Sequence, residues 1–253
     1  MQIAQPYALN EQGTRPNNED AIYPLKYGAT PANHFFIVCD GMGGHENGEV
    51  ATHSVCNSFA TFLRELPPDE FDETVFDRAL HVAFDALDQK DNPNETGKKM
   101  GTTLAFLYLN SKQAFIAYIG DSRIYHLRKN DHGQVSILFQ STDHSLINEL
   151  LKAEAITEEE AANHPKKNII TRAMQPHLER RCKADKYITG DIAAGDRFFL
   201  CSDGVLESLT NQQLCTIAAE HDQDKTLINA IQQLCEAHSH DNFSAWLISI
   251  IKP

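Results

Sequence analysis

The sequence predicts an α+β fold in which mainly antiparallel sheets are flanked by separate layers of helices. Strand candidates at 102–109, 113–119 and 123–127 follow one another with links of only a few residues. A parallel pair needs a much longer crossover, so these strands must pair antiparallel. Helix candidates gather at 50–90 and again at 211–238. This grouping favours helical layers over the regular strand–helix alternation of a doubly wound sheet.

Segments enriched in β-branched and aromatic residues predict enough strands for at least one large sheet. They are residues 3–9, 34–39, 102–109, 113–119, 123–127, 135–139, 197–201 and 243–251. Segments with apolar residues three and four positions apart predict helices at 50–66, 74–90, 145–153, 211–220 and 225–238. We expect their apolar stripes to pack against a sheet rather than to line a cofactor site. No repeat or linker interrupts the chain, which favours a single domain over residues 1–253.

Composition and charge argue against several classes of partner. The 253 residues carry 22 Lys and Arg against 35 Asp and Glu, a formal net charge of −13 at pH 7. This charge repels nucleic acid and anionic lipid, so we expect neither as a partner. The sequence has no signal peptide pattern and no apolar stretch near the roughly 20 residues that cross a bilayer. The 6 cysteines are scattered without a C-x-x-C pair, which favours free thiols in a reducing cytosol. We expect a cytoplasmic protein, and a monomer.

Four aspartates lie beside apolar runs, in turns that carry Gly or Asn: Asp40, Asp121, Asp203 and Asp241. One such aspartate usually marks only a turn. Because buried strands deliver the adjacent residue to the edge of a sheet, several aspartates can converge at one rim. Converging carboxylates repel one another unless a cation lies among them, and hard oxygen ligands suit Mg²⁺ or Mn²⁺. The run Asn18-Glu19-Asp20 adds two more acids to this predicted metal site.

Two other kinds of phosphate chemistry fit the sequence poorly. The run Gly41-Met42-Gly43-Gly44 has Glu46 in place of the third glycine of G-x-G-x-x-G, and it lacks the Lys-Ser/Thr of a P-loop. A covalent aspartyl-phosphate mechanism of the haloacid-dehalogenase kind needs an aspartate two residues before Asp203, where Cys201 stands. The sequence therefore favours hydrolysis at a metal site over nucleotide cradling or a protein nucleophile.

Eight motifs in order along the chain resemble the PP2C (PPM) family of metal-dependent protein serine/threonine phosphatases. They are Gly13 to Asp20, Val38 to His45, Met100 to Thr103, Gly120 to Arg123, Thr142 to Ser145, Ile169 to Ala173, Cys201 to Gly204 and Asp241 to Ser244. The resemblance implies a four-layer α-β-β-α sandwich of two mainly antiparallel sheets flanked by helices. It also implies hydrolysis of phosphoserine and phosphothreonine by water that bridges two divalent cations. The expected partners are phosphorylated proteins, the substrates of a serine/threonine kinase.

The resemblance also implies roles for individual residues. Asp40 is similar to the carboxylate that bridges both metals, with the Gly41 carbonyl and Glu19 on one ion, and Asp203 and Asp241 on the other.

Three further residues have roles implied by the same motifs. Asp20 matches an acceptor for metal-bound water. Arg15 matches the phosphate-binding arginine, whose planar fork suits phosphate oxygens. Asp121 matches the ligand of a third, weaker metal in bacterial relatives, which Asp203 could share.

Some residues depart from the family pattern. Met42 stands where animal and plant members often have a histidine proposed as the general acid, and this methionine is typical of bacterial members. His45, metal-bound water and the absence of a protein acid all stay open as explanations. The segment 171–176 departs from the usual Thr-Arg-Ala-Leu-Gly.

Residues 145–168 resemble the mobile flap beside the site. Within them, Thr157 to Glu160 predicts a capping box and Pro165 the end of a short helix.

Two alternative functions stay open at the level of sequence. One is a non-catalytic PP2C-like domain that binds a partner, which loss of Asp40, Asp203 or Asp241 would have indicated. The other is a metal-dependent phosphohydrolase for a small phosphorylated molecule, because the motifs specify the chemistry but not the leaving group.

Overall fold

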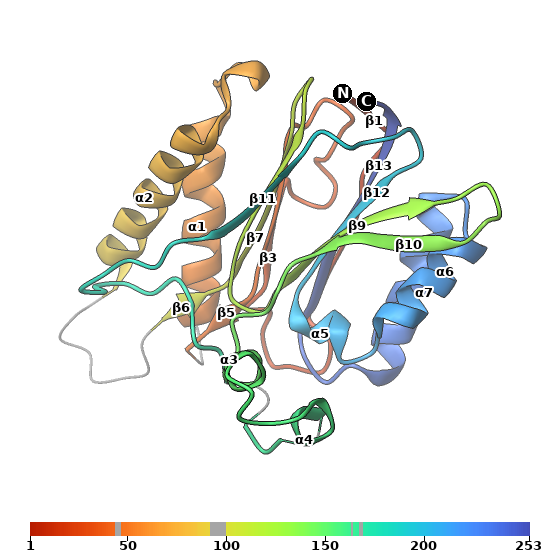
Figure 1. The fold of residues 1–253 in the computed structure, drawn as a ribbon. Helices are drawn as coiled ribbons and strands as arrows, with labels where there is room; N and C mark the ends of the chain where they lie inside the picture. Colours follow the sequence, from red (N-terminus) through yellow and green to blue (C-terminus); the bar gives the residue numbers. More distant parts are fainter. Residues whose placement is uncertain (44–46, 92–99, 163, 167–168) are drawn as a thin grey trace.

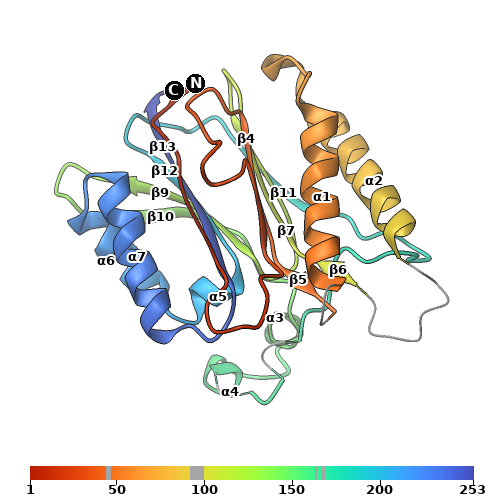
Figure 2. The same cartoon turned by 180° about the vertical axis from the view of Figure 1, so that it is seen from behind.

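The computed structural model describes residues 1–43, 47–91, 100–162, 164–166 and 169–253. Two sheets pack face to face between two pairs of helices (Figures 1 and 2). Helices α1 (Asn47–Leu63) and α2 (Glu73–Lys90) cover one sheet, and α6 (Asn211–Glu220) and α7 (Asp224–His238) cover the other. This arrangement confirms the predicted α+β class and the four-layer sandwich.

All strand pairs of the described residues are antiparallel. The five-stranded sheet has the order β11-β8-β7-β4-β3, with bounds Asp185–Thr189, Ala114–Ile119, Leu104–Leu109, Phe35–Cys39 and Ala21–Tyr23. The six-stranded sheet has the order β1-β13-β12-β9-β10, and β2 also pairs with β13. The bounds of β1, β13, β12, β9, β10 and β2 are Gln2–Ile3, Phe243–Lys252, Arg197–Cys201, Arg123–Lys129, Val135–Gln140 and Tyr7–Glu11. Strands β5 (Gly41–Met42) and β6 (Gly101–Thr102) form a small separate pair.

Three apolar clusters fill the spaces between the layers. Between the sheets, Phe36 of β4 meets Trp246 of β13 edge to face, with ring centroids 5.3 Å apart. Beneath the first helical layer, Phe59 of α1 packs against Phe106 of β7 at 5.2 Å. The third cluster joins the six-stranded sheet to α6 and α7. Because β4, β7, β8 and β12 are buried on both faces, they appear in the sequence as continuous apolar runs.

Side chains cap several helices at their first turn. Asp72 accepts a hydrogen bond from Val75 N at 2.8 Å at the start of α2, and Thr210 forms a capping box at the start of α6. In the predicted flap, α3 spans Leu146–Lys152 and α4 spans Glu158–Ala162. Thr157 N donates to Glu160 Oε2 at 2.8 Å and Glu160 N to Thr157 Oγ1 at 3.2 Å, which confirms that capping box. None of the described helices is long and apolar enough to cross a membrane.

The structure corrects several predicted boundaries. The predicted strand 3–9 is split into β1 and β2, because Pro6 has no N–H to donate to a ladder. The predicted strand 102–109 is split at Thr103, whose N–H bonds to the carbonyl of Asp40 instead. Helix α1 spans 47–63 rather than 50–66.

Several short elements were missed by the sequence analysis. Strands β3 and β5 have only 3 and 2 residues, and β11 is largely polar. The short helix α5 (Asp203–Leu206) and the 3₁₀ turn Pro68–Glu70 were also not predicted.

A buried ionic network at the far end of β12 joins β9 to the turn at 193–196. Asp196, with none of its surface exposed, accepts from His126 Nε2 at 2.8 Å and from Arg128 Nε at 2.7 Å. The backbone N–H of Ala193 adds a bond at 2.8 Å. Burial alone raises the pKa of Asp196, but the hydrogen bonds from Arg128 and His126 outweigh burial and hold that pKa below its usual range.

We predict that Asp196→Ala lowers the free energy of unfolding by about 3–5 kcal/mol, because it leaves buried donors and a cation without their partner. Urea unfolding measures the change. The control is Asp191→Ala, which removes an exposed partner of Arg128 3.0 Å away and should cost less than about 1 kcal/mol. Equal effects of the two substitutions would contradict the role given to Asp196.

Candidate active site

The antiparallel topology brings four of the predicted aspartates to one end of the sandwich. Asp40 follows β4 and Asp121 follows β8 by two residues. Both strands pair antiparallel with β7, so they run in the same direction and end at the same rim. In the other sheet, Asp203 follows β12 and Asp241 precedes β13, and these strands are antiparallel neighbours. Figure 1 shows this end of the sheets beside α5 and β5.

The carboxyl groups at this rim raise one another's pKa. Burial, and next the charge of Asp203, raise the pKa of Asp40 well above its usual range. Burial raises the pKa of Asp20 to about 7, although a hydrogen bond from Ser202 opposes the shift. Burial and the charge of Asp203 likewise raise the pKa of Asp121 to about 7. Burial also raises the pKa values of Asp203 and Glu19. Repulsion among these carboxylates opposes full ionisation of the cluster. A cation among them would offset that repulsion.

Buried hydroxyl groups hold the turns that carry the acids. Thr103 Oγ1 accepts from Asp40 N at 2.9 Å and shares a 2.7 Å hydrogen bond with Ser122 Oγ. Ser202 Oγ donates to Asp20 Oδ2 at 2.8 Å. No role was predicted for these hydroxyl residues from the sequence, although each belongs to one of the eight motifs. Their position next to the motif acids was the signal available.

Asn242 ties the segment that carries Glu19 to the start of β13. Its Oδ1 accepts from Glu19 N at 2.9 Å. Its Nδ2 donates to the carbonyls of Gln12 at 2.7 Å and Asn17 at 2.9 Å. The side chain is buried, so these bonds replace those it would make to water. Asn242 therefore fixes Glu19 relative to Asp241, a role that the sequence analysis also missed.

Two glycines allow backbone segments of the site to approach closely. A Cβ on Gly41 would lie 2.5 Å from the carbonyl oxygen of Glu19, and one on Gly204 would lie 1.9 Å from that of Asn242. No side chain fits at such distances. Glycine at these positions therefore brings the ends of β4 and β12 against the segments that carry Glu19 and Asp241.

Arg15 reaches the cluster but is paired within it. Its Nη2 lies 2.6 Å from Asp241 Oδ2. As they stand, no three carboxyl, thiol or imidazole side chains of the described residues are spaced to hold a metal ion. For Asp241 Oδ2 to bind a cation, it must leave Arg15.

The oxygen donors of the cluster suit a divalent cation in their chemistry. Carboxylates and a backbone carbonyl are hard ligands of the kind that Mg²⁺ and Mn²⁺ prefer. Asp121 Oδ1 is buried and has no hydrogen-bond partner among the described residues. Buried polar atoms rarely go without a partner. A hydrated cation beside Asp121 would supply one.

The predicted flap leaves and rejoins the sandwich at one point. Leu146 N donates to Ile169 O, and Thr171 N donates to His144 O, each at 2.9 Å. Helices α3 and α4 extend from this base beyond the end of the sheets, near β5 and α5 (Figure 1).

The residues that depart from the family pattern lie close to this base. Met174 is fully buried and exchanges two 2.9 Å backbone hydrogen bonds with Thr102 of β6. Met42, which stands in the position of the expected acid, lies on β5, the partner of β6. His45, one of the alternatives for that acid, lies outside the described residues.

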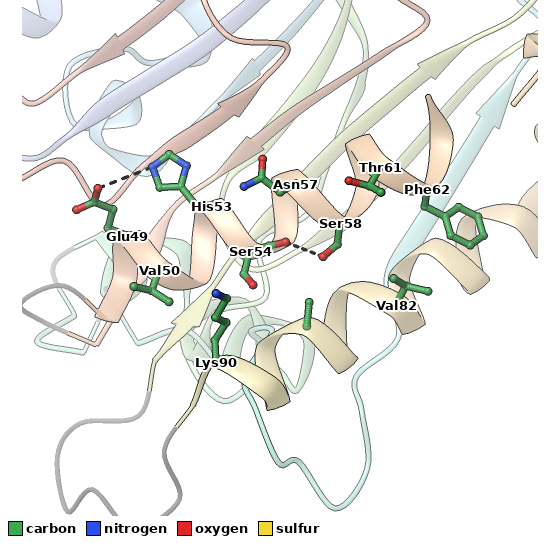
Figure 3. A pocket seen from close by; sticks show the side chains of 11 residues that line it. Glu49, Val50, His53, Ser54, Asn57, Ser58, Thr61, Phe62, Val82 and Lys90 are labelled. Atoms are coloured by element: carbon green, nitrogen blue, oxygen red, sulfur yellow. Dashed lines mark hydrogen bonds and ion pairs between the residues drawn. The ribbon is translucent and has the colours of Figure 1, made fainter. Parts of the chain in front are cut away.

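A cavity of about 810 Å³ lies between α1 and α2, away from the acids. Figure 3 shows its lining, which includes Asn57, Ser58, Val82 and Lys90. None of the predicted catalytic or metal-binding residues lines it. The chemistry therefore belongs to the carboxylate rim and not to this groove.

Comparison with known families decides which enzyme class this rim belongs to. The family model for protein phosphatase 2C matches residues 12–250. Protein phosphatase PhpP of Streptococcus pneumoniae is 32% identical over 244 residues, which cover 93% of each chain. The chain belongs to the protein phosphatase 2C family.

Solved PP2C structures share the whole fold. The serine/threonine phosphatase PstP/Ppp of Mycobacterium tuberculosis aligns over 100% of both chains, with a TM-score of 0.82 and 25% identity. The catalytic domain of PstP in complex with two manganese ions gives the same values. The Streptococcus agalactiae serine/threonine phosphatase aligns over 97% of this chain and 98% of its own, with a TM-score of 0.78 and 26% identity. These matches confirm the resemblance to bacterial PP2C phosphatases and the predicted enzyme class.

We predict that Asn242→Ala lowers the free energy of unfolding by about 1–3 kcal/mol, because it leaves the N–H of Glu19 unpaired and removes a buried side chain that donates to two carbonyls. Urea unfolding measures this loss. Asn33→Ala, which removes an exposed 2.7 Å bond to Thr30 N, is the control and should cost less. An unfolding free energy of Asn242→Ala equal to that of the parent protein would show that the bridge does not hold the site.

Proposed function

We propose that this PP2C protein hydrolyses phosphoserine and phosphothreonine in proteins at the carboxylate rim, with two tightly bound Mn²⁺ or Mg²⁺ ions. The observation that carries the proposal is the convergence of strand-end acids beside Arg15 in a chain of this family. The PstP catalytic domain, which has the same fold, is described in complex with two manganese ions. We propose one phosphatase domain over residues 1–253.

The roles proposed for the acids follow their places at the rim. Asp40 follows a strand of the five-stranded sheet and is close enough to Asp203, from the other sheet, to feel its charge. It is proposed to bridge both cations. Glu19 and the Gly41 carbonyl, brought together by the close approach at Gly41, are proposed for one cation. Asp203 and Asp241, from neighbouring strands, are proposed for the other.

The charge balance of the site explains the role proposed for Arg15. The four acids Glu19, Asp40, Asp203 and Asp241 offset the charge of two divalent cations, so the loaded cluster alone attracts a phosphate dianion weakly. Arg15, freed from Asp241 when that acid binds metal, supplies a planar pair of donors for phosphate oxygens. Two bound cations would lower the pKa of water from 15.7 toward roughly 7 and make hydroxide available at neutral pH. Asp20, held by Ser202, is proposed to orient that water by accepting a hydrogen bond from it.

The alternative functions are less well supported. A non-catalytic binding domain gives no reason for retaining Asp40, Asp203 and Asp241 together at one rim. A phosphohydrolase for small molecules has the same chemistry, and an assay of phosphopeptides against nucleotides separates it from a protein phosphatase. We propose a cytoplasmic monomer that opposes a serine/threonine kinase, and its six free cysteines agree with a reducing compartment.

We predict that activity requires Mn²⁺ or Mg²⁺ and that Asp40→Ala or Asp203→Ala removes most of it, because both acids are proposed metal ligands. Phosphopeptide hydrolysis with and without a chelator measures the dependence, and circular dichroism checks that the variants fold. Unchanged turnover in excess chelator, with metal content verified as nil, would reject the mechanism.

We predict that Arg15→Ala raises KM for phosphopeptides more than it lowers kcat, because a phosphate clamp acts on substrate and transition state alike. Steady-state kinetics give both constants. A large loss of kcat at unchanged KM would instead assign Arg15 to the transition state alone.

We predict that Asp121→Ala keeps the two tight metals but weakens turnover, because Asp121 is proposed to hold a third, easily exchanged cation. Adding its carboxylate to the other four gives the loaded pair a net negative charge, and mostly water ligands suit a weak site. Calorimetry counts the tight ions, and activity is followed at rising metal concentration. Undiminished activity in Asp121→Ala, together with only two ions at high metal concentration, would end the third-metal proposal.

A further inference from the structure

A second cavity, of about 620 Å³, opens beside the carboxylate rim. It lies between β2 and β3, and its other walls come from the turn at 25–28 and the first turns of α1. Asn18 and Asp20 of the proposed catalytic site line one part of it. We refer to this cavity as the edge cleft. It leads from the proposed reacting centre along the outer strands of both sheets.

Both strands beside the edge cleft are edge strands. Strand β3 (Ala21–Tyr23) pairs with β4 on one side, and β2 pairs with β13. No further strand pairs with either one in the part of the chain that the structure describes. Among the described residues, no backbone hydrogen bond outside the β3–β4 ladder involves residues 21–23. Ala21 and Ile22 of β3 are only 3% and 5% exposed, so the edge cleft offers a ligand side chains rather than a free backbone edge.

The turn that follows β3 presents two large apolar side chains to solvent. Leu25 is 71% exposed and Tyr27 is 95% exposed. Their backbone is nevertheless anchored, because Gly28 N donates to Leu25 O at 2.8 Å and Lys26 Nζ donates to Glu11 Oε1 at 2.5 Å. Binding of a partner to these side chains therefore costs little free energy for ordering the loop.

The charges of the edge cleft favour a basic partner. Lys26 is neutralised by Glu11, with which it forms an ion pair. Glu49, 47% exposed, has His53 Nε2 at 3.9 Å, too far for a strong hydrogen bond. The Glu49 carboxylate is therefore available to a Lys or Arg side chain of a ligand, whereas an acidic ligand would be repelled.

We propose that the edge cleft binds the extended segment of a phosphoprotein substrate that flanks its phosphorylated residue. The segment lies in the edge cleft, with an apolar or aromatic side chain against Leu25 and Tyr27 and a basic one near Glu49. This inference rests on the proposed phosphoprotein phosphatase function and specifies its substrate.

A paired assay separates recognition in the edge cleft from chemistry at the rim. The probes are short phosphoserine peptides with one Phe and one Arg in an alanine background, and p-nitrophenyl phosphate, which has no flanking residues. Leu25→Ala/Tyr27→Ala should raise KM for the best peptide by about tenfold, equivalent to about 1.4 kcal/mol. It should leave kcat, and hydrolysis of p-nitrophenyl phosphate, unchanged.

The control variant removes two other exposed apolar side chains, which do not line the edge cleft. Leu138→Ala/Ile251→Ala replaces residues that are 41% and 58% exposed on β10 and β13, and it should change neither substrate's KM. Equal KM values for parent and Leu25→Ala/Tyr27→Ala on every peptide, while both hydrolyse p-nitrophenyl phosphate, would overturn the inference and leave the proposed function standing. Hydrolysis of p-nitrophenyl phosphate with no peptide hydrolysed by the parent protein would count against the proposed function itself.

Discussion

Repulsion among the carboxylates at one end of the sandwich is the interaction to which the rest of the site responds. Asp40, Asp121 and Asp203 are crowded by protein atoms and by one another, and their pKa values are raised accordingly. The ion pair of Arg15 with Asp241 relieves this repulsion in part. Divalent cations would replace this ion pair, because their charge offsets several carboxylates at once.

The fold keeps the acids together in spite of their repulsion. The sheets are held by apolar clusters on both faces, and that burial is independent of the charge at the rim. Gly204 and Gly41 bring neighbouring segments into backbone contact, and Asn242 fastens the segment of Glu19 to the start of β13. Rigid strands thus supply the position of each acid, and the stability of the sandwich outweighs the cost of placing them there.

The sequence predicted the features of the site that depend on strand ends. Asp40 stands directly after a buried apolar strand and Asp203 two residues after another, so the sequence placed both at the edge of a sheet. The pairing of Arg15 with Asp241 could not be predicted in this way, because it depends on the path of a loop and on side-chain geometry. Asn242 was missed for a related reason, since its partners lie more than 200 residues away in the chain. Strands β3 and β11 escaped detection because one is very short and the other is mostly polar, and both depend on neighbours for their pairing.

Thermal unfolding at increasing Mn²⁺ concentration, for the parent protein and Asp203→Asn, tests the central claim most directly. If repulsion at the rim is offset by cations, Mn²⁺ raises the Tm of the parent protein, since a ligand that binds only the folded state stabilises it. In chelator, Asp203→Asn should have the higher Tm of the two, because it removes one of the repelling charges, and it should respond much less to Mn²⁺. A parent Tm that does not change with Mn²⁺, or one that exceeds the Tm of Asp203→Asn in chelator, would contradict the account.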